Sequence, residues 1–147
     1  IMDSKLRLGP HAMAGEVGYI SYEPEHVSSS KQPGWLESNL SKEKLRERFP
    51  ELKDGSISSD LVDYTAKYIA LTIANISNLL DIEQFVLDGD LIRRLEEFGL
   101  KERIDYYTAR YCLLDVLVDK PICSHPSLTG LSELIISKGL YDLVKSE

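Results

Sequence analysis

The chain has 147 residues, a net charge of −7 and an isoelectric point near 5.0, with 43% apolar and 28% charged residues. This length can bury a single core, and the composition is typical of a soluble globular domain, so we expect one domain over residues 1–147. An acidic surface repels phosphate backbones and anionic lipids, which argues against direct contact with nucleic acid or a membrane. The sequence has neither an apolar run of roughly 18 residues nor a signal-peptide pattern.

The two cysteines, Cys112 and Cys123, lie in no C-x-x-C pair, and the three histidines form no H-x-x-x-H pair. This pattern favours two free thiols in a reducing compartment, which predicts a cytoplasmic protein, over the alternative of a disulfide.

The first third of the chain is short of regular elements. Residues 1–8 alternate weakly, as at the end of a strand, and we interpret the chain as a piece of a longer protein because it starts inside that strand. Gly9-Pro10 ends the pattern. A turn around Gly15 and a short strand at Val17–Tyr22 follow, and then a polar loop over residues 23–34.

Two helical regions come next. Residues 35–49 predict two short helices, with Ser41 as the N-cap of the second. Residues 59–80 predict the longest helix, capped by Ser58 or Ser59. Its apolar residues recur at spacings of three and four, which favours packing against a sheet over a coiled-coil seam. They are Val62, Ala66, Ile69, Ile73, Ile76 and Leu80.

The remaining sequence alternates short strands with helices. We expect strands at Gln84–Leu87 and Pro121–His125. We expect helices at residues 91–98, ended by Gly99, at residues 100–117 and at residues 128–144. Such alternation is typical of an α/β layered domain.

Three stretches resemble the ROK family of repressors, uncharacterised reading frames and sugar kinases. Gly9–Tyr19 (GPHAMAGEVGY) is similar to the family's G-x-x-x-x-A-G-E-x-G-H segment, and Asp3–Leu6 stands at its D-G-K-L turn. Gly34–Glu37 (GWLE) resembles the end of the C-x-C-G-x-x-G-C-x-E segment. Residues 73–91 resemble the long helix, the L-D-P-E turn and the strand ending in I-V-I-G-G. The match covers nearly the whole chain.

The resemblance implies an α/β fold of the actin-like, ribonuclease-H-like type, in which two lobes enclose the ligand. This chain would be the C-terminal lobe, incomplete at its N-terminus, and its partner would be the missing N-terminal lobe. Family members commonly form homo-oligomers, so the resemblance implies a homo-oligomer as well.

The resemblance also implies a sugar site. Glu16 and Glu37 match the positions that hydrogen-bond sugar hydroxyls, and Tyr19 replaces the family's histidine, so the implied ligand is a hexose or an amino sugar. A carboxylate can accept from two adjacent hydroxyls. The alternatives are that Glu16 caps backbone N–H groups in the glycine turn and that Glu37 complements a helix dipole.

Asp88 and Gly89 stand where the family carries the Gly-Gly that approaches the nucleotide, which makes them weaker candidates for nucleotide binding. Carboxylates there would repel a polyphosphate. The alternative is a turn in which Asp90 caps the next helix.

The stretch between Glu23 and Trp35 lacks the zinc cysteines of the family, and His26 alone cannot hold zinc. We therefore expect no metal site and a solvated His26. Trp35 favours a packing role over a sugar platform.

The acidic catalytic base and the D-x-G-G-T phosphate loop of family kinases are absent from the chain, so we expect no catalytic residue here. The predicted function is the sugar-sensing, catalytically inactive lobe of a transcriptional regulator, with no cofactor in this chain.

The alternative is the C-terminal half of a divergent sugar kinase of the glucokinase, fructokinase or N-acetylhexosamine kinase type, which would use ATP and Mg²⁺. A lobe without either activity is a third possibility. The features that separate the first two readings, a helix-turn-helix or a D-x-G-G-T loop, would lie upstream.

Overall fold

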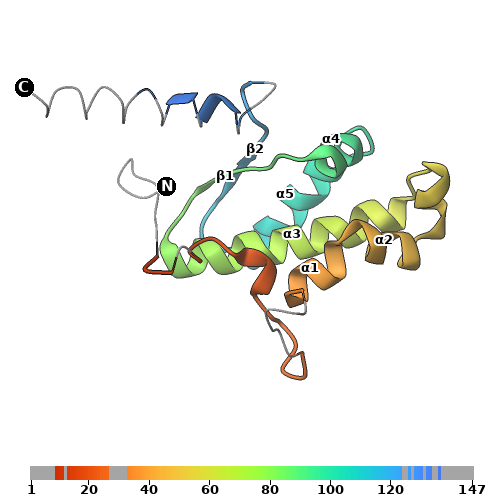
Figure 1. Ribbon diagram of the computed structural model, residues 1–147, viewed down its shortest axis with the longest axis horizontal. Coiled ribbons are helices and arrows are strands. Elements are labelled where there is room, and N and C mark those ends of the chain that lie inside the picture. The colour runs from red at the N-terminus through yellow and green to blue at the C-terminus, as the bar shows by residue number, and fades with distance from the viewer. Residues whose placement is uncertain are drawn as a thin grey trace, which may run out of the picture.

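The computed structural model describes residues 9–11, 13–26, 33–123, 126, 128–130, 132, 133 and 136. This part of the chain is mostly helical and carries one small parallel sheet (Figure 1). The strand end expected over residues 1–8 and much of the helix expected over residues 128–144 lie outside the described residues. No described helix is both long enough and apolar enough to cross a membrane.

The strand predicted at Val17–Tyr22 is wrong, because Val17–Tyr19 form a 3-10 helix, η1. Gly15, at a φ of 93°, turns the chain just before it. The N–H groups of Tyr19 and Ile20 then bond to carbonyls three residues earlier, each at 3.1 Å. A strand satisfies its backbone groups through a neighbouring strand, and here a local helical turn satisfies them instead.

The two short helices predicted next are confirmed as α1 (Trp35–Leu40) and α2 (Lys42–Arg48). Ser41 separates them in an extended conformation, and its hydroxyl accepts from the N–H of Lys44 at 3.4 Å, as expected of an N-cap. The loop after α2 contains a second 3-10 helix, η2 (Pro50–Asp54). Gly55, at a φ of 84°, ends it.

The long helix is confirmed as α3 (Ser59–Leu80), and Ser58 is its N-cap, accepting from the N–H of Leu61 at 3.3 Å. Its partner is α5 (Leu100–Tyr111), which lies alongside it (Figure 1). The prediction that α3 packs mainly against a sheet is therefore wrong for the described residues. The sheet has two strands of three residues each, too few to cover a helix of 22 residues.

The sheet pairs β1 (Gln84–Val86) with β2 (Leu117–Asp119) in parallel, with Phe85 opposite Val118. Helices α4 (Asp90–Glu96) and α5 form the crossover that parallel strands require. The strand predicted at Gln84–Leu87 is thus confirmed to within one residue. Gly99, at a φ of 82°, separates the two helices as predicted.

The helix predicted over residues 100–117 ends early, at Tyr111, because α3 supplies a side chain that replaces the helical bonds. The amide of Asn78 accepts from the N–H of Leu113 at 3.0 Å and donates to the carbonyl of Tyr111 at 3.4 Å. The chain is thereby free to enter β2. The strand predicted at Pro121–His125 is wrong over its described residues, and proline at its start has no N–H to give to a ladder.

One apolar cluster joins α2, η2, α3, α4, α5 and β2. Its buried members are Leu45, Leu52, Leu61, Val62, Ala66, Ile73, Leu95, Leu100, Ile104 and Val118. The predicted stripe of α3 is confirmed at Val62, Ala66 and Ile73, whereas Leu80 at its end is exposed. The actin-like lobe stays a prediction.

Candidate functional site

The two segments that carry the predicted sugar residues meet at a pair of glycines. A Cβ at Gly34 would lie 2.0 Å from the carbonyl oxygen of Gly18 and 2.5 Å from the Cα of Tyr19. Both distances are far shorter than the contacts that real Cβ atoms make, so only glycine fits at position 34. The start of α1 therefore lies directly on η1, although a polar loop separates the two in the sequence (Figure 1).

This contact brings Glu37 over η1. A Cβ at Gly18 would lie 3.5 Å from the Cβ of Glu37 and 3.8 Å from its Oε2. Gly18 stands between Glu16, which precedes η1, and Tyr19, which ends it. Glu16, Tyr19 and Glu37 therefore come from two segments that are in contact, and we call these three residues the η1–α1 site.

All three side chains of the η1–α1 site are exposed, and Tyr19 keeps 40% of its surface in solvent. None of the three makes a side-chain hydrogen bond or ion pair within the described part of the chain. Glu16 is the N-cap residue of η1, but its side chain makes no capping hydrogen bond, so the capping alternative finds no support. Glu37 does lie in the first turn of α1, where an acid complements the helix dipole. Its carboxylate nevertheless remains open to a ligand.

Trp35, the first residue of α1, is buried next to Gly34 in the sequence. It is only 7% exposed, and its indole N–H donates to the Oε2 of Glu23 at 2.9 Å. Tyr22 meets the ring edge-on at 5.0 Å between centroids, and Tyr68 of α3 lies 5.3 Å away. The expected packing role of Trp35 is confirmed. The part played by Glu23 was missed, because a lone acid in a polar loop carries no sequence signal.

The aromatic row continues along α3 to Tyr64, whose ring lies 4.7 Å from that of Tyr68 and 4.5 Å from the guanidinium of Arg48. Burial, reinforced by the neighbouring Tyr68 hydroxyl, raises the pKa of Tyr64 to about 12. Its phenol therefore stays protonated at neutral pH and donates to the Oδ1 of Asn39 at 3.2 Å. This bond attaches the end of α1 to α3.

The expectation that His26 is solvated is wrong. The residue is partly buried, and its Nε2 is fully buried without a hydrogen-bond partner in the described regions. The backbone forms a turn here, in which the N–H of His26 donates to the carbonyl of Glu23 at 3.1 Å. Among the described residues, no three His, Cys, Asp or Glu side chains gather in a way that could hold a metal ion.

The two cysteines are free, as predicted. Cys112 is partly buried, which raises the pKa of its thiol and keeps it protonated. Cys123 is exposed. Burial is the cause of the pKa shift of Cys112, so this thiol is not activated as a nucleophile.

The turn at Asp88–Asp90, where nucleotide binding was predicted, is organised by one arginine. The guanidinium of Arg93 pairs with the carboxylate of Asp88 and, at 2.5 Å, with that of Asp90. The prediction that Asp90 caps α4 is wrong, because Gly89 is the N-cap and Asp90 is the first helical residue, engaged by Arg93. Gly89 has a φ of 134°, and a Cβ there would meet nothing within 4 Å. Glycine is therefore favoured at position 89 by its positive φ, and not by a lack of space for a side chain.

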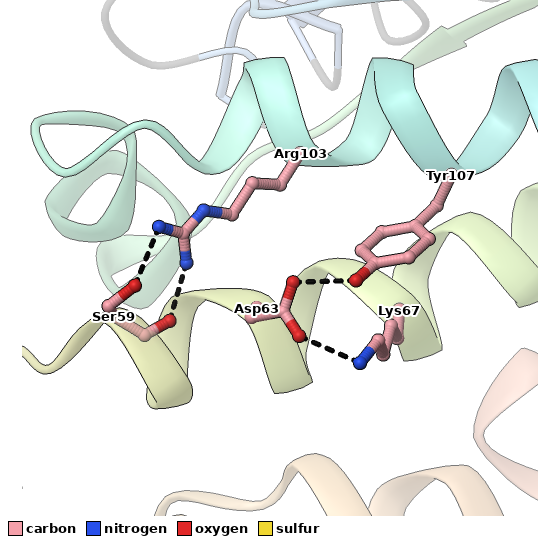
Figure 2. A network of polar contacts seen from close by, with 5 residues as sticks. All are labelled: Ser59, Asp63, Lys67, Arg103 and Tyr107. Carbon is pink, nitrogen blue, oxygen red and sulfur yellow. Dashed lines mark hydrogen bonds and ion pairs between the residues drawn. The ribbon is translucent and has the colours of Figure 1, made fainter.

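A second polar cluster links α3 to α5 (Figure 2). The carboxylate of Asp63 accepts from the phenol of Tyr107 at 2.6 Å and pairs with the ammonium of Lys67 at 2.8 Å. Nearby, Arg103 donates to both the hydroxyl, at 2.8 Å, and the carbonyl of Ser59. We call these five residues the α3–α5 clamp.

The titratable groups of the α3–α5 clamp are held in their ordinary charge states. Hydrogen bonds from Lys67 and Tyr107 lower the pKa of Asp63. The bonds to Asp63 raise the pKa of Lys67 and of Tyr107. All three pKa values thus move away from neutrality, whereas a general acid or base needs one near it. The clamp is a structural link and does not have the character of a proton-transfer site.

Comparison with protein-family models, with curated proteins and with solved structures gives no match for this chain. The resemblance in the sequence and the geometry of the η1–α1 site are therefore what supports a functional assignment.

Proposed function

We propose that this chain is the sugar-binding lobe of a ROK-type transcriptional regulator, and that Glu16, Glu37 and Tyr19 bind a hexose or an amino sugar. The observation that carries the proposal is the contact of Gly34 with Gly18 and Tyr19. It joins the two segments that carry these residues, although the two acids stand 21 residues apart in the sequence, and all three side chains are exposed.

The chemistry of this surface suits a polyol. The two carboxylates have no partner among the described residues, so they offer acceptors for two pairs of vicinal hydroxyls, and charge strengthens each bond. The phenol of Tyr19 can donate or accept, and its exposed ring can lie against the apolar face of a sugar. Trp35, which is buried and bonded to Glu23, anchors the start of α1, the helix that carries Glu37.

The lobe supplies half of such a site, and the N-terminal lobe would supply the other half. Closure of two lobes over a ligand excludes water and strengthens these hydrogen bonds. We place the protein in the cytoplasm, where its two free thiols persist, and propose that it works as a homo-oligomer.

One observation favours the alternative of a sugar kinase. Arg93 pairs with both Asp88 and Asp90, so the turn at the end of β1 carries one net negative charge instead of two. Its repulsion of ATP and Mg²⁺ at Asp88 and Gly89 is correspondingly weaker. In this alternative the N-terminal lobe would bring the catalytic base and the phosphate loop, and this chain would still supply no catalytic residue.

The test is calorimetric titration of the full-length protein, with wild type, Glu16→Gln and Glu37→Gln measured against a panel of hexoses and N-acetylated amino sugars. Each substitution removes one charged acceptor, so affinity should fall about 10- to 100-fold with an unchanged melting temperature. Glu43→Gln, an exposed acid in α2, is the control and should bind as wild type does. A sugar that binds both variants as it binds wild type would place the site elsewhere.

A further inference from the structure

A small hollow lies between α2 and α4, away from the residues of the η1–α1 site. Its volume is about 240 Å³, and six residues line it. We call it the α2–α4 pocket. Its lining residues are Lys42, Arg46, Leu52, Asp90, Leu91 and Arg94.

The pocket is cationic on a chain that is otherwise acidic. Three of its side chains carry positive charge, and its one carboxylate, Asp90, is engaged at 2.5 Å by Arg93, which is not among the lining residues. Neither Lys42 nor Arg46 forms an ion pair with any described residue. Positive charge therefore exceeds negative charge among the lining residues, although the chain as a whole carries −7.

Arg46 gives the clearest sign that a group is missing. Its side chain is partly buried, and its Nε is fully buried without a hydrogen-bond partner in the described structure. A buried donor of this kind is costly unless water or a ligand satisfies it. Arg94 is held in place because its guanidinium donates to the carbonyl of Gly55, at the end of η2. The Arg94 donor is thus positioned before any ligand arrives.

We infer that the α2–α4 pocket binds the phosphate group of a small ligand. Guanidinium groups match the spacing of phosphate oxygens and bind them through parallel N–H bonds, and Lys42 adds a mobile point charge. Leu52 and Leu91 form apolar walls, which lower the local polarity and strengthen these bonds. The volume is below the roughly 300–1,000 Å³ of pockets that enclose a whole drug-sized ligand, so it suits a phosphate group with at most a small organic substituent.

Free phosphate and a phosphate monoester share this chemistry, and the inference does not depend on the proposed sugar function. The experiment measures the melting temperature of the full-length protein while inorganic phosphate or glycerol phosphate replaces chloride at constant ionic strength. Constant ionic strength keeps general screening the same in every sample. Wild type should show a saturable rise in melting temperature. A stronger response to the ester would identify a phosphorylated metabolite as the ligand, and a stronger response to the free ion would identify phosphate itself.

Arg46→Gln and Lys42→Gln should each weaken the apparent phosphate affinity about 10- to 100-fold, because each removes one charged donor. Lys42 is exposed, so its variant tests the pocket even where Arg46→Gln perturbs packing. Lys44→Gln is the matched control, since Lys44 lies on the same helix but is paired with Glu47 at 2.8 Å. No saturable response in wild type, or an equal loss in Lys44→Gln, would overturn the assignment.

Discussion

In the core between α3 and α5, apolar side chains fill the space between the helices, whereas residues 13–26 are attached to α1 and α3 by one glycine contact and a few aromatic and polar groups. Ile73 and Ile104 are at most 3% exposed in the first region. In the second, the backbone of Gly18 leaves no room for a side chain at position 34. The one hydrogen bond of the Trp35 side chain goes to Glu23.

This difference separates stability from recognition. Hydrophobic burial is roughly proportional to area and tolerates small shifts in position, so the core depends on its volume being filled. A glycine contact and a directed hydrogen bond depend on position. The η1–α1 site can therefore be displaced by a change that leaves the core folded.

The largest effect should come from emptying the core. Ile73→Ala should lower the free energy of unfolding by about 2–5 kcal/mol, because the truncation loses buried area and leaves a cavity. Asn75→Ala, two residues away on the exposed side of α3, should change it by less than about 0.5 kcal/mol. Urea denaturation of both variants measures this contrast. Equal, small losses would show that Ile73 does not belong to the core.

Sequence reasoning located the core elements because their signals are local. The caps at Ser41 and Ser58 and the stripe of α3 follow from hydroxyl chemistry and helical periodicity. The end of α5 was missed because Asn78, 33 residues upstream of Tyr111, determines it. Val17–Tyr22 has the composition of a strand, but its described surroundings offer no strand to pair with.

The candidate site was predictable only in part, for the same reason. The pattern around Glu16 and Glu37 indicated that these residues belong together. It could not show that Gly34 lies on Gly18, which is a contact in three dimensions. The pairing of Arg93 with Asp90 was open to prediction from its i,i+3 spacing, and the capping interpretation of Asp90 overlooked it.

A smaller effect, confined to the other region, should come from Gly34→Ala. Its new Cβ would overlap the carbonyl oxygen of Gly18, so α1 and η1 must separate. We expect a loss of about 1–3 kcal/mol, as for other overpacked sites. Hydrogen exchange should show faster exchange over residues 13–26, whereas the amides of α3 and α5 should keep their protection.

Gly18→Ala is the control for this comparison. Its Cβ would meet Glu37 at 3.5 Å, an ordinary contact, so the two segments should stay together. If Gly34→Ala leaves the exchange of residues 13–26 unchanged, the glycine contact does not hold the site. If it speeds exchange in α3 and α5 as well, the two regions unfold as one unit.

The smallest effect should come from the α3–α5 clamp, which stabilises the core by a hydrogen bond at its surface. Tyr107→Phe removes the phenol that donates to Asp63, and we expect a loss of about 1 kcal/mol at neutral pH, since exposure to solvent weakens the bond. Tyr106→Phe, on the adjacent and more exposed ring, should have a smaller effect. Urea denaturation of both variants gives the comparison.

The same bond should make this loss depend on pH. Lys67 and Tyr107 lower the pKa of Asp63 in the folded protein, so the carboxylate contributes stability above its unfolded pKa of about 3.9. That contribution is lost as the pH falls through the lower, folded pKa, where protonation removes the charged acceptor. The difference between wild type and Tyr107→Phe should therefore be constant from pH 5 to 7, on the order of 1 kcal/mol, and shrink below about pH 4. A difference that stays unchanged down to the acid transition would mean that the hydroxyl of Tyr107 stabilises the fold equally well beside a protonated Asp63, with no contribution from the charge on the carboxylate.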